Sequence, residues 1–347
     1  MQASRHDIPP YQAPSWLPGG HLQTIYAYFF PPLPEVPYQR ERWILPDGDF
    51  IDLDWMAGPR GAPLVVLFHG LEGDSRGHYA LTLLDAVRKQ GWRGVVPHFR
   101  GCSGEPNRLP RAYHSGDSAE IEMILRRLRH EHPAVPLFAV GISLGGNALL
   151  KWLGENGPEA ARLVDAAVAV SAPLDLAAAG HQLDRGFNRI SYVRHLLRTL
   201  KQKALEKITT HRLPIDPDAV HNINTLYAFD ELYTAPMHGF RNADDYWRRA
   251  SSKPWLNSIA VPTLIVNAKN DPFLPAAALP AQEEVSASVT LDFPEHGGHV
   301  GFVSGPFPGR LSWLPQRILG FFGDHLPAPK LAPASQTRHN SASYSAV

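Results

Sequence analysis

The chain has 347 residues, of which 44% are apolar, enough to bury the core of one large domain. Lys and Arg together number 33, and so do Asp and Glu, so the formal net charge is zero. Because no long basic run accompanies this balance, we expect no nucleic-acid partner. Cys102 is the single cysteine, which excludes an intramolecular disulfide and a cysteine-based zinc site.

The first residues given do not show the pattern of an export or membrane signal. They lack the charged start and apolar run of a signal peptide, and no later segment has about 18 uninterrupted apolar residues. We therefore expect a cytoplasmic protein without a stable membrane anchor; the oligomeric state stays open. Residues 1–40 are rich in proline and aromatic residues, which predicts an irregular arm packed on the core rather than a free linker.

The segment after the arm predicts strands. Two alternating runs, Arg42–Leu45 and Phe50–Met56, flank a turn sequence and indicate a hairpin. Six short apolar runs without strict alternation then suit strands buried on both faces of a parallel sheet. These runs are Leu64–Phe68, Gly94–Pro97, Leu137–Val140, Ala166–Val170, Thr263–Val266 and Val289–Phe293.

Helical periodicity appears between the predicted strands, around residues 80–87 and 121–128, so strand and helix alternate and predict an α/β sandwich with helices on both faces of the sheet. The alternation stops between about residues 173 and 259, where no strand pattern appears and basic residues are frequent. We expect a helical cap there, inserted into a domain spanning residues 41–326. Residues 327–347 are rich in Pro, Ala and Ser and predict a disordered tail.

A serine motif follows the run Leu137–Val140. Gly141-Ile-Ser143-Leu-Gly145 stands between this strand and a predicted helix, the setting in which G-x-S-x-G forms a sharp turn that exposes a nucleophilic serine. A serine before a helix is equally expected as a simple N-cap. The interpretation of Ser143 therefore depends on finding a base and an acid that could activate it.

His299 is the candidate base and Asp271 the candidate acid, and with Ser143 they follow the expected chain order of Ser, Asp and His. Asp271 follows the strand run Thr263–Val266, and His299 follows the run Val289–Phe293, so both fall on the sheet edge that carries Ser143. An Asp-Pro turn and an ordinary histidine are the plain alternatives. His296 is a rival base, and it could be imagined as a metal pair with His299. We prefer His299 as base, since Gly297 and Gly298 permit close approach, and we expect neither metal nor organic cofactor.

The oxyanion formed during acyl transfer needs backbone N–H donors. We expect one from Leu144, the residue after the nucleophile, and one from Leu71 in the loop after the third strand. His69 is interpreted as a structural brace for that loop and Cys102 as packing. Glu72 and Asp74 either line the entrance or are solvated charges, which is the commoner case.

These motifs together resemble the YheT-like branch of the α/β-hydrolases, also called α/β-hydrolase family four, which includes plant embryogenesis-associated proteins and animal lipid-ester hydrolases. The similarity runs from about Pro14 to Phe322. It rests on PSWLPGGHLQTI at 14–25, HGLEG at 69–73, FRGCSG at 99–104, YHSG at 113–116, GISLGGN at 141–147, NDPF at 270–273 and GGHVGF at 297–302.

The resemblance implies an α/β-hydrolase fold, a triad of Ser143, Asp271 and His299, and cleavage of small-molecule carboxylic esters: short- to medium-chain acyl esters or acylglycerols. Two alternatives stay open. A thioesterase or acyltransferase would use the same acyl-enzyme, and the same scaffold could be a non-catalytic binding module, because fold alone does not set function.

Overall fold

The computed structural model describes residues 8–326; the expected tail, residues 327–347, lies outside this range. The described residues form an eight-stranded sheet in the order β1-β2-β4-β3-β5-β6-β7-β8. The first strands make the predicted hairpin, β1 pairing antiparallel with β2 and β2 antiparallel with β4. All other pairs are parallel. The strands are β1 (Tyr38–Ile44), β2 (Phe50–Met56), β3 (Leu64–Phe68), β4 (Arg93–Pro97), β5 (Leu137–Ile142), β6 (Ala166–Val170), β7 (Thr263–Val266) and β8 (Val289–Asp292).

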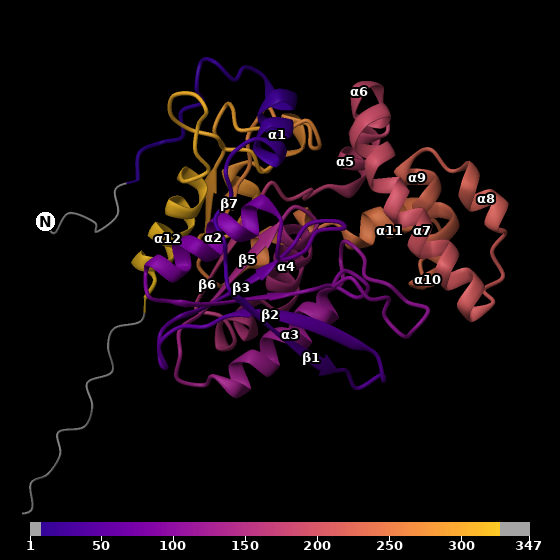
Figure 1. Ribbon diagram of the computed structural model, residues 1–347, viewed down its shortest axis with the longest axis horizontal. Helices are drawn as coiled ribbons and strands as arrows, with labels where there is room; N and C mark the ends of the chain where they lie inside the picture. Colours follow the sequence, from indigo (N-terminus) through magenta and orange to yellow (C-terminus); the bar gives the residue numbers. More distant parts are fainter. Residues whose placement is uncertain (1–7, 327–347) are drawn as a thin grey trace, which may run out of the picture.

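Two helical layers cover the sheet because its central strands are apolar on both faces (Figure 1). Helices α3 (Ser118–Glu131) and α4 (Leu144–Asn156) pack on one face, with the side chains of Leu64, Val66 and Phe68. Helices α2 (His78–Lys89) and α12 (Trp313–Asp324) pack on the other. The expected α/β-hydrolase fold is thereby confirmed.

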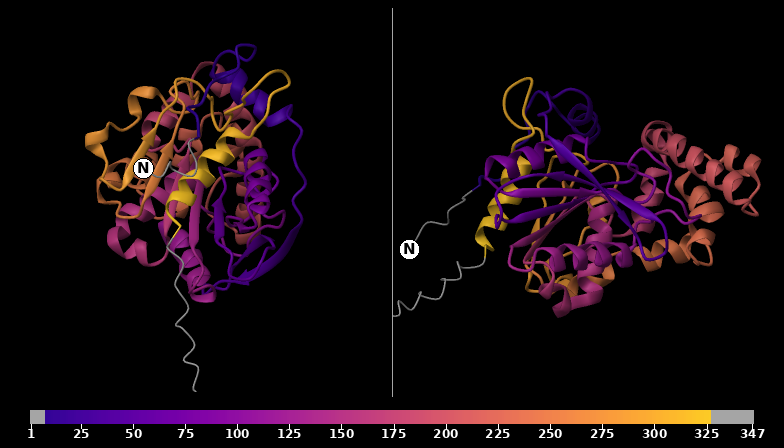
Figure 2. Two further views of the ribbon diagram at one scale, coloured as in Figure 1. Left: turned by 90° about the vertical axis from the view of Figure 1, so that its left-hand side faces the viewer. Right: turned by 60° about the horizontal axis from the view of Figure 1, so that its bottom comes forward.

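Only helices and loops lie between β6 and β7, the segment for which the sequence predicts a cap, before the strand that leads to Asp271. The cap helices gather on one side of the sheet (Figures 1 and 2) and have an apolar core of their own. They are α5 (Leu176–Leu183), α6 (Gly186–Asn188), α7 (Arg194–His211), α8 (Pro217–Asn222), α9 (Leu226–Phe229), α10 (Ala235–Met237) and α11 (Ala243–Ala250), with single π-helical turns at η2 (Arg189–Val193) and η3 (Asp230–Thr234).

The arm differs from the sequence expectation in one element. It packs on the core, but Gly20–Phe29 forms helix α1 in a segment that we expected to be irregular. The first residue of this helix follows Gly19, whose φ of 78° suits glycine, and no side chain caps it. The helix therefore lacks a local start signal and depends on tertiary contacts. Within residues 8–326, no helix combines the length and the apolar character needed to cross a bilayer.

Candidate active site

Ser143 lies at the sharp turn between β5 and α4. Its backbone angles, φ 51° and ψ −118°, are unfavourable for any residue other than glycine. The flanking glycines permit the turn. A Cβ on Gly141 would lie 2.5 Å from the Gly145 carbonyl oxygen, and one on Gly145 would lie 2.4 Å from the Phe68 carbonyl oxygen. The Ser143 side chain makes no N-cap hydrogen bond, so the capping interpretation is wrong.

The structure brings Ser143, His299 and Asp271 into one hydrogen-bonded chain. The Ser143 hydroxyl lies 3.0 Å from Nε2 of His299, and Nδ1 of His299 lies 2.9 Å from Oδ2 of Asp271. With the proton on Nδ1 donated to the carboxylate, Nε2 is free to accept the serine proton. The Asp271 side chain is 1% exposed and that of His299 is 11% exposed, so water reaches the serine side of the pair more easily.

Other contacts fix the positions of the acid and the histidine. Oδ1 of Asp271 accepts a hydrogen bond of 2.8 Å from the Phe273 N–H, which leaves Oδ2 directed at the imidazole. The Phe273 ring stacks on that of His299 at 3.9 Å between centroids. His296, the rival base, is exposed and lies 3.3 Å from the Asn270 amide nitrogen. Within the described residues, no three His, Cys, Asp or Glu side chains are grouped to hold a metal ion.

The loop after β3 passes directly beside Ser143. A Cβ on Gly70 would lie 3.3 Å from the Ser143 Cβ, and the next residue, the expected oxyanion donor Leu71, lines the same cavity as Ser143. No acceptor within residues 8–326 takes the Leu71 N–H. The Leu144 N–H belongs to the first turn of α4, where an intrahelical partner is absent. Both N–H groups are thus available to a bound oxygen atom.

His69 and Cys102 have the structural surroundings expected from the sequence. His69 is fully buried; its Nε2 accepts the Phe99 N–H at 3.0 Å, and its Nδ1 donates to the Gly70 carbonyl at 2.8 Å. Burial lowers the pKa of His69 to about 3, so the ring stays neutral. Burial also raises the pKa of the Cys102 thiol to about 12, which makes it a poor nucleophile at neutral pH.

Glu72 is not the solvated charge that we considered the commoner case. Its side chain is 7% exposed and accepts hydrogen bonds of 2.9 Å from the Tyr113 hydroxyl and from Nζ of Lys203. Lys203 belongs to α7, so this contact joins the cap to the loop that carries Leu71. The sequence offered no signal for a pair separated by 131 residues.

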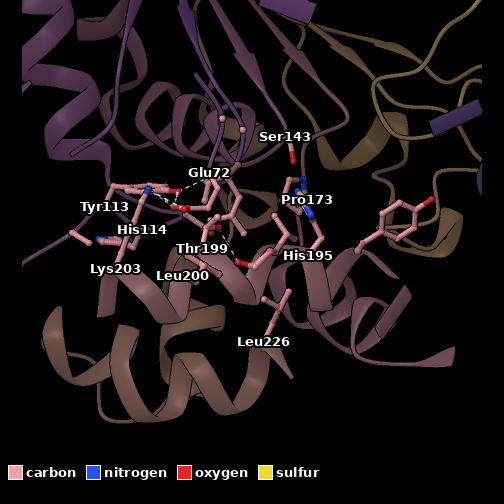
Figure 3. A pocket seen from close by; sticks show the side chains of 18 of the residues that line it. Glu72, Tyr113, His114, Ser143, Pro173, His195, Thr199, Leu200, Lys203 and Leu226 are labelled. Atoms are coloured by element: carbon pink, nitrogen blue, oxygen red, sulfur yellow. Dashed lines mark hydrogen bonds and ion pairs between the residues drawn. The ribbon is translucent and has the colours of Figure 1, made fainter. Parts of the chain in front are cut away.

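A cavity of about 1110 Å³ opens between the sheet edge and the cap, and Ser143 lies in its wall. Figure 3 shows Ser143 on one side of this cavity, with His195, Thr199 and Leu200 of α7 on the cap side. The part of the lining that comes from α7 is mixed: Leu196, Leu200 and Ala204 are apolar, whereas His195, Thr199, Gln202, Lys203, Glu206 and Lys207 are polar. Glu72 and His114 are further polar side chains of the lining.

An α/β sheet with a strained serine turn and an adjacent histidine–aspartate pair is the arrangement of the α/β-hydrolases. The chain belongs to this family, whose sequence model, described as the alpha/beta hydrolase fold, matches residues 63–306. It is 44% identical to YheT of Escherichia coli strain K12, a candidate esterase, over 89% of this chain and 91% of that protein. It is 31% identical to the mouse phospholipase ABHD3, over 84% of this chain and 73% of that protein.

The fold also has solved counterparts. An esterase of Pyrococcus furiosus superposes with a TM-score of 0.55 at 17% identity, covering 94% of this chain and the whole of that one. At this identity the likeness supports the fold alone. The relatives confirm the expected YheT-like α/β-hydrolase of the esterase and lipase type.

Proposed function

We propose that this protein hydrolyses small carboxylic esters with Ser143 as nucleophile, His299 as general base and Asp271 as the acid that orients the imidazole. The observation that carries the proposal is the continuous hydrogen-bonded chain of these side chains, ending in the wall of a large cavity. A serine hydroxyl needs such a base to become nucleophilic at neutral pH.

The reaction follows from this geometry. His299 takes the Ser143 proton as Oγ bonds to the ester carbonyl carbon, and the N–H groups of Leu71 and Leu144 stabilise the resulting oxyanion. The imidazolium then protonates the leaving alcohol as its C–O bond breaks, which leaves an acyl group on Ser143. Water attacks this acyl-enzyme with His299 again as base. The bond between the acyl carbon and Oγ of Ser143 then breaks, His299 returns the proton to Oγ, and the carboxylic acid is released.

The cavity supports acyl esters or acylglycerols as the substrate class. Leu183, Leu196 and Leu200 of the cap line it, and they offer an acyl chain an apolar wall within reach of Ser143. The mouse relative named a phospholipase is consistent with an acylated substrate. We propose that the chain cleaves short- to medium-chain acyl esters or acylglycerols and needs neither metal nor organic cofactor.

Labelling with a serine-directed fluorophosphonate tests the proposal. We expect the probe to form a covalent adduct at Ser143, located by mass spectrometry of the digested protein, and we expect Ser143→Ala to remain unlabelled. Turnover of an ester series and a matched thioester series then compares substrate classes. Absence of an adduct on Ser143 in folded protein would favour the binding-module alternative.

A further inference from the structure

The run PSWLPGGHLQTI at 14–25 takes no part in the chemistry proposed above, although it is one of the most distinctive motifs of the sequence. It contains the first turn of helix α1. Figure 1 shows this helix beside the loops that follow β7 and β8, the loops that carry Asp271 and His299. The contacts between these three segments are closer than ordinary side-chain packing.

Backbone meets backbone at this junction, and glycine makes the approach possible. A Cβ on Gly20 would lie 1.9 Å from the Asn270 carbonyl oxygen. A Cβ on Gly298 would lie 2.7 Å from both the Gly20 carbonyl oxygen and the Thr24 hydroxyl, and Gly298 has φ 64°. The helix turn therefore fits directly against the residue that precedes His299.

Gln23 links the two loops. Its side chain is buried, at 1% exposure, and its Oε1 accepts hydrogen bonds from the Gly297 N–H at 2.8 Å and from the Asn270 amide at 3.0 Å. Its Nε2 donates to the Leu17 carbonyl at 3.0 Å. The Asn270 amide oxygen in turn accepts the Gly298 N–H at 3.0 Å. The Gln23 side chain thus fixes the position of Asn270, next to Asp271, relative to Gly297, two residues before His299.

Thr24 acts on His299 itself. Its hydroxyl donates to the Gly20 carbonyl at 2.7 Å, which directs the oxygen lone pairs toward the His299 N–H, accepted at 2.8 Å. The next residue is held as well, since the Ser171 hydroxyl accepts the Val300 N–H at 3.0 Å. Val300 has φ 54°, so these bonds hold a backbone conformation that the loop would not favour alone.

We infer that the first turn of helix α1 is a positioning element for the reaction, in which Gln23 and Thr24 set the place of His299 relative to Asp271 and Ser143. The inference rests on the proposed function. Neither residue transfers a proton; each holds backbone whose displacement would lengthen the hydrogen bond between His299 and Ser143. Reaction rates are sensitive to such displacements, since a shift of about 1 Å can cost roughly 100-fold.

The test uses four variants of the full-length protein, assayed with a p-nitrophenyl butyrate concentration series and with the fluorophosphonate probe. Gln23→Met keeps the volume and removes the acceptor, and Thr24→Val removes the hydroxyl. Thr24→Ser keeps the hydroxyl and should retain the activity that Thr24→Val loses. Thr209→Val is the matched control, because Thr209 makes the same intrahelical bond, to the Leu205 carbonyl at 2.9 Å, on an exposed part of α7.

We expect kcat and the labelling rate to fall together by about tenfold or more in Gln23→Met and Thr24→Val. KM should change little in Gln23→Met, because Gln23 does not line the cavity. Thr24→Ser and Thr209→Val should stay within about twofold of the wild type. Circular dichroism and thermal unfolding identify any variant that fails to fold; if Gln23→Met fails, the contrast between Thr24→Val and Thr24→Ser decides.

Three outcomes would overturn the inference, and only the last of them also overturns the proposed function. If the wild type is labelled at Ser143 but folded Thr24→Val turns over substrate as fast as Thr209→Val, the inference is wrong and the proposed function stands. If Thr24→Ser loses as much activity as Thr24→Val, the hydroxyl is not the agent and the inference is equally wrong. If the wild type is not labelled at Ser143, the proposed function fails and takes the inference with it.

Discussion

In the proposed mechanism, Ser143, His299 and Asp271 each act only through a neighbour, so we expect the losses of activity on replacing them to be strongly non-additive. Ser143→Ala and His299→Ala should each lower kcat by about 10³-fold or more, and the triple variant should be little worse than the poorer single one. Asp271→Asn should cost less where the geometry survives. Steady-state kinetics of the folded variants measures these effects, and independent multiplicative losses would contradict the assignment.

His296 provides the control for the histidine. It lies three residues before His299 in the same loop but is exposed and has no contact with Ser143 among the hydrogen bonds of residues 8–326. His296→Ala should therefore retain most of the activity. Equal losses in His296→Ala and His299→Ala, with circular dichroism showing both folded, would mean that the loop rather than the imidazole matters.

Single residues differ in how far the sequence could predict them. Ser143, Asp271 and His299 lie in local motifs that follow a fixed chain order, so the sequence pattern and the chemistry were enough to select all three as candidate site residues. Glu72 carries no such mark, because its burial depends on Tyr113 and Lys203, which are distant in the chain. A charge whose partner lies on another element looks the same in sequence as a solvated one.

The same contrast holds for whole elements. Strands β3, β6 and β7 were predicted with their observed bounds, because short apolar runs between turn residues are typical of buried parallel strands. Helix α1 was missed, since its start has no capping side chain and its stability comes from contacts with loops about 250 residues away. Local propensity cannot report such contacts.

The stability of the fold should depend on the contact between Lys203 of helix α7 and Glu72 of the core. Lys203→Ala would leave the buried Glu72 carboxylate with Tyr113 as its remaining side-chain partner, which should cost about 1–3 kcal/mol after allowing for the partial exposure of Lys203. Lys201→Ala is the matched control on the same helix: Nζ of Lys201 donates to the His221 carbonyl at an exposed position. It should cost less than about 0.5 kcal/mol. Urea unfolding compares the two, and equal losses would contradict the link.

The cap helix should also set the preferred acyl length. Leu200→Trp adds volume inside the cavity, so we expect kcat/KM for long acyl chains to fall by about tenfold relative to short ones. Thr210→Trp, exposed on the same helix and outside the cavity wall, is the control. An ester series of graded chain length gives the profile. An unchanged profile in Leu200→Trp would show that the acyl group lies elsewhere.

At the scale of the whole molecule, two sets of buried ionisable groups have opposite effects on the stability of the fold as the pH falls below neutral. Burial lowers the pKa of His69, His114 and His238 to about 3, so their contribution to stability is lost as the pH falls below about 6.5. Burial raises the pKa of Glu120 and Asp230 to about 7, so their contribution grows as the pH falls from about 7 to 4. The two sets therefore oppose each other between pH 7 and 5.

Below about pH 4 this compensation ends. Glu120 and Asp230 are then protonated in both states and add nothing further, whereas the histidines continue to destabilise. Burial alone would raise the pKa of Asp49, Asp52 and Asp54, but their hydrogen bonds, including those from Arg100, Arg42 and Arg40, hold it below the usual value. Such carboxyls stabilise the fold above their unfolded pKa and lose that contribution as the pH falls through the folded one.

We therefore expect the free energy of unfolding to be nearly flat between pH 7 and 5 and to drop steeply below about pH 4. Urea unfolding at intervals of half a pH unit from 7.5 to 3 measures the curve. His238→Asn removes one of the buried neutral histidines. Between pH 7 and pH 5, the free energy of unfolding of this variant should therefore fall by about 2 kcal/mol less than that of the wild type. A wild-type curve that declines evenly from pH 7 to 4, or a His238→Asn curve parallel to it, would show that these groups do not control the acid stability of the fold.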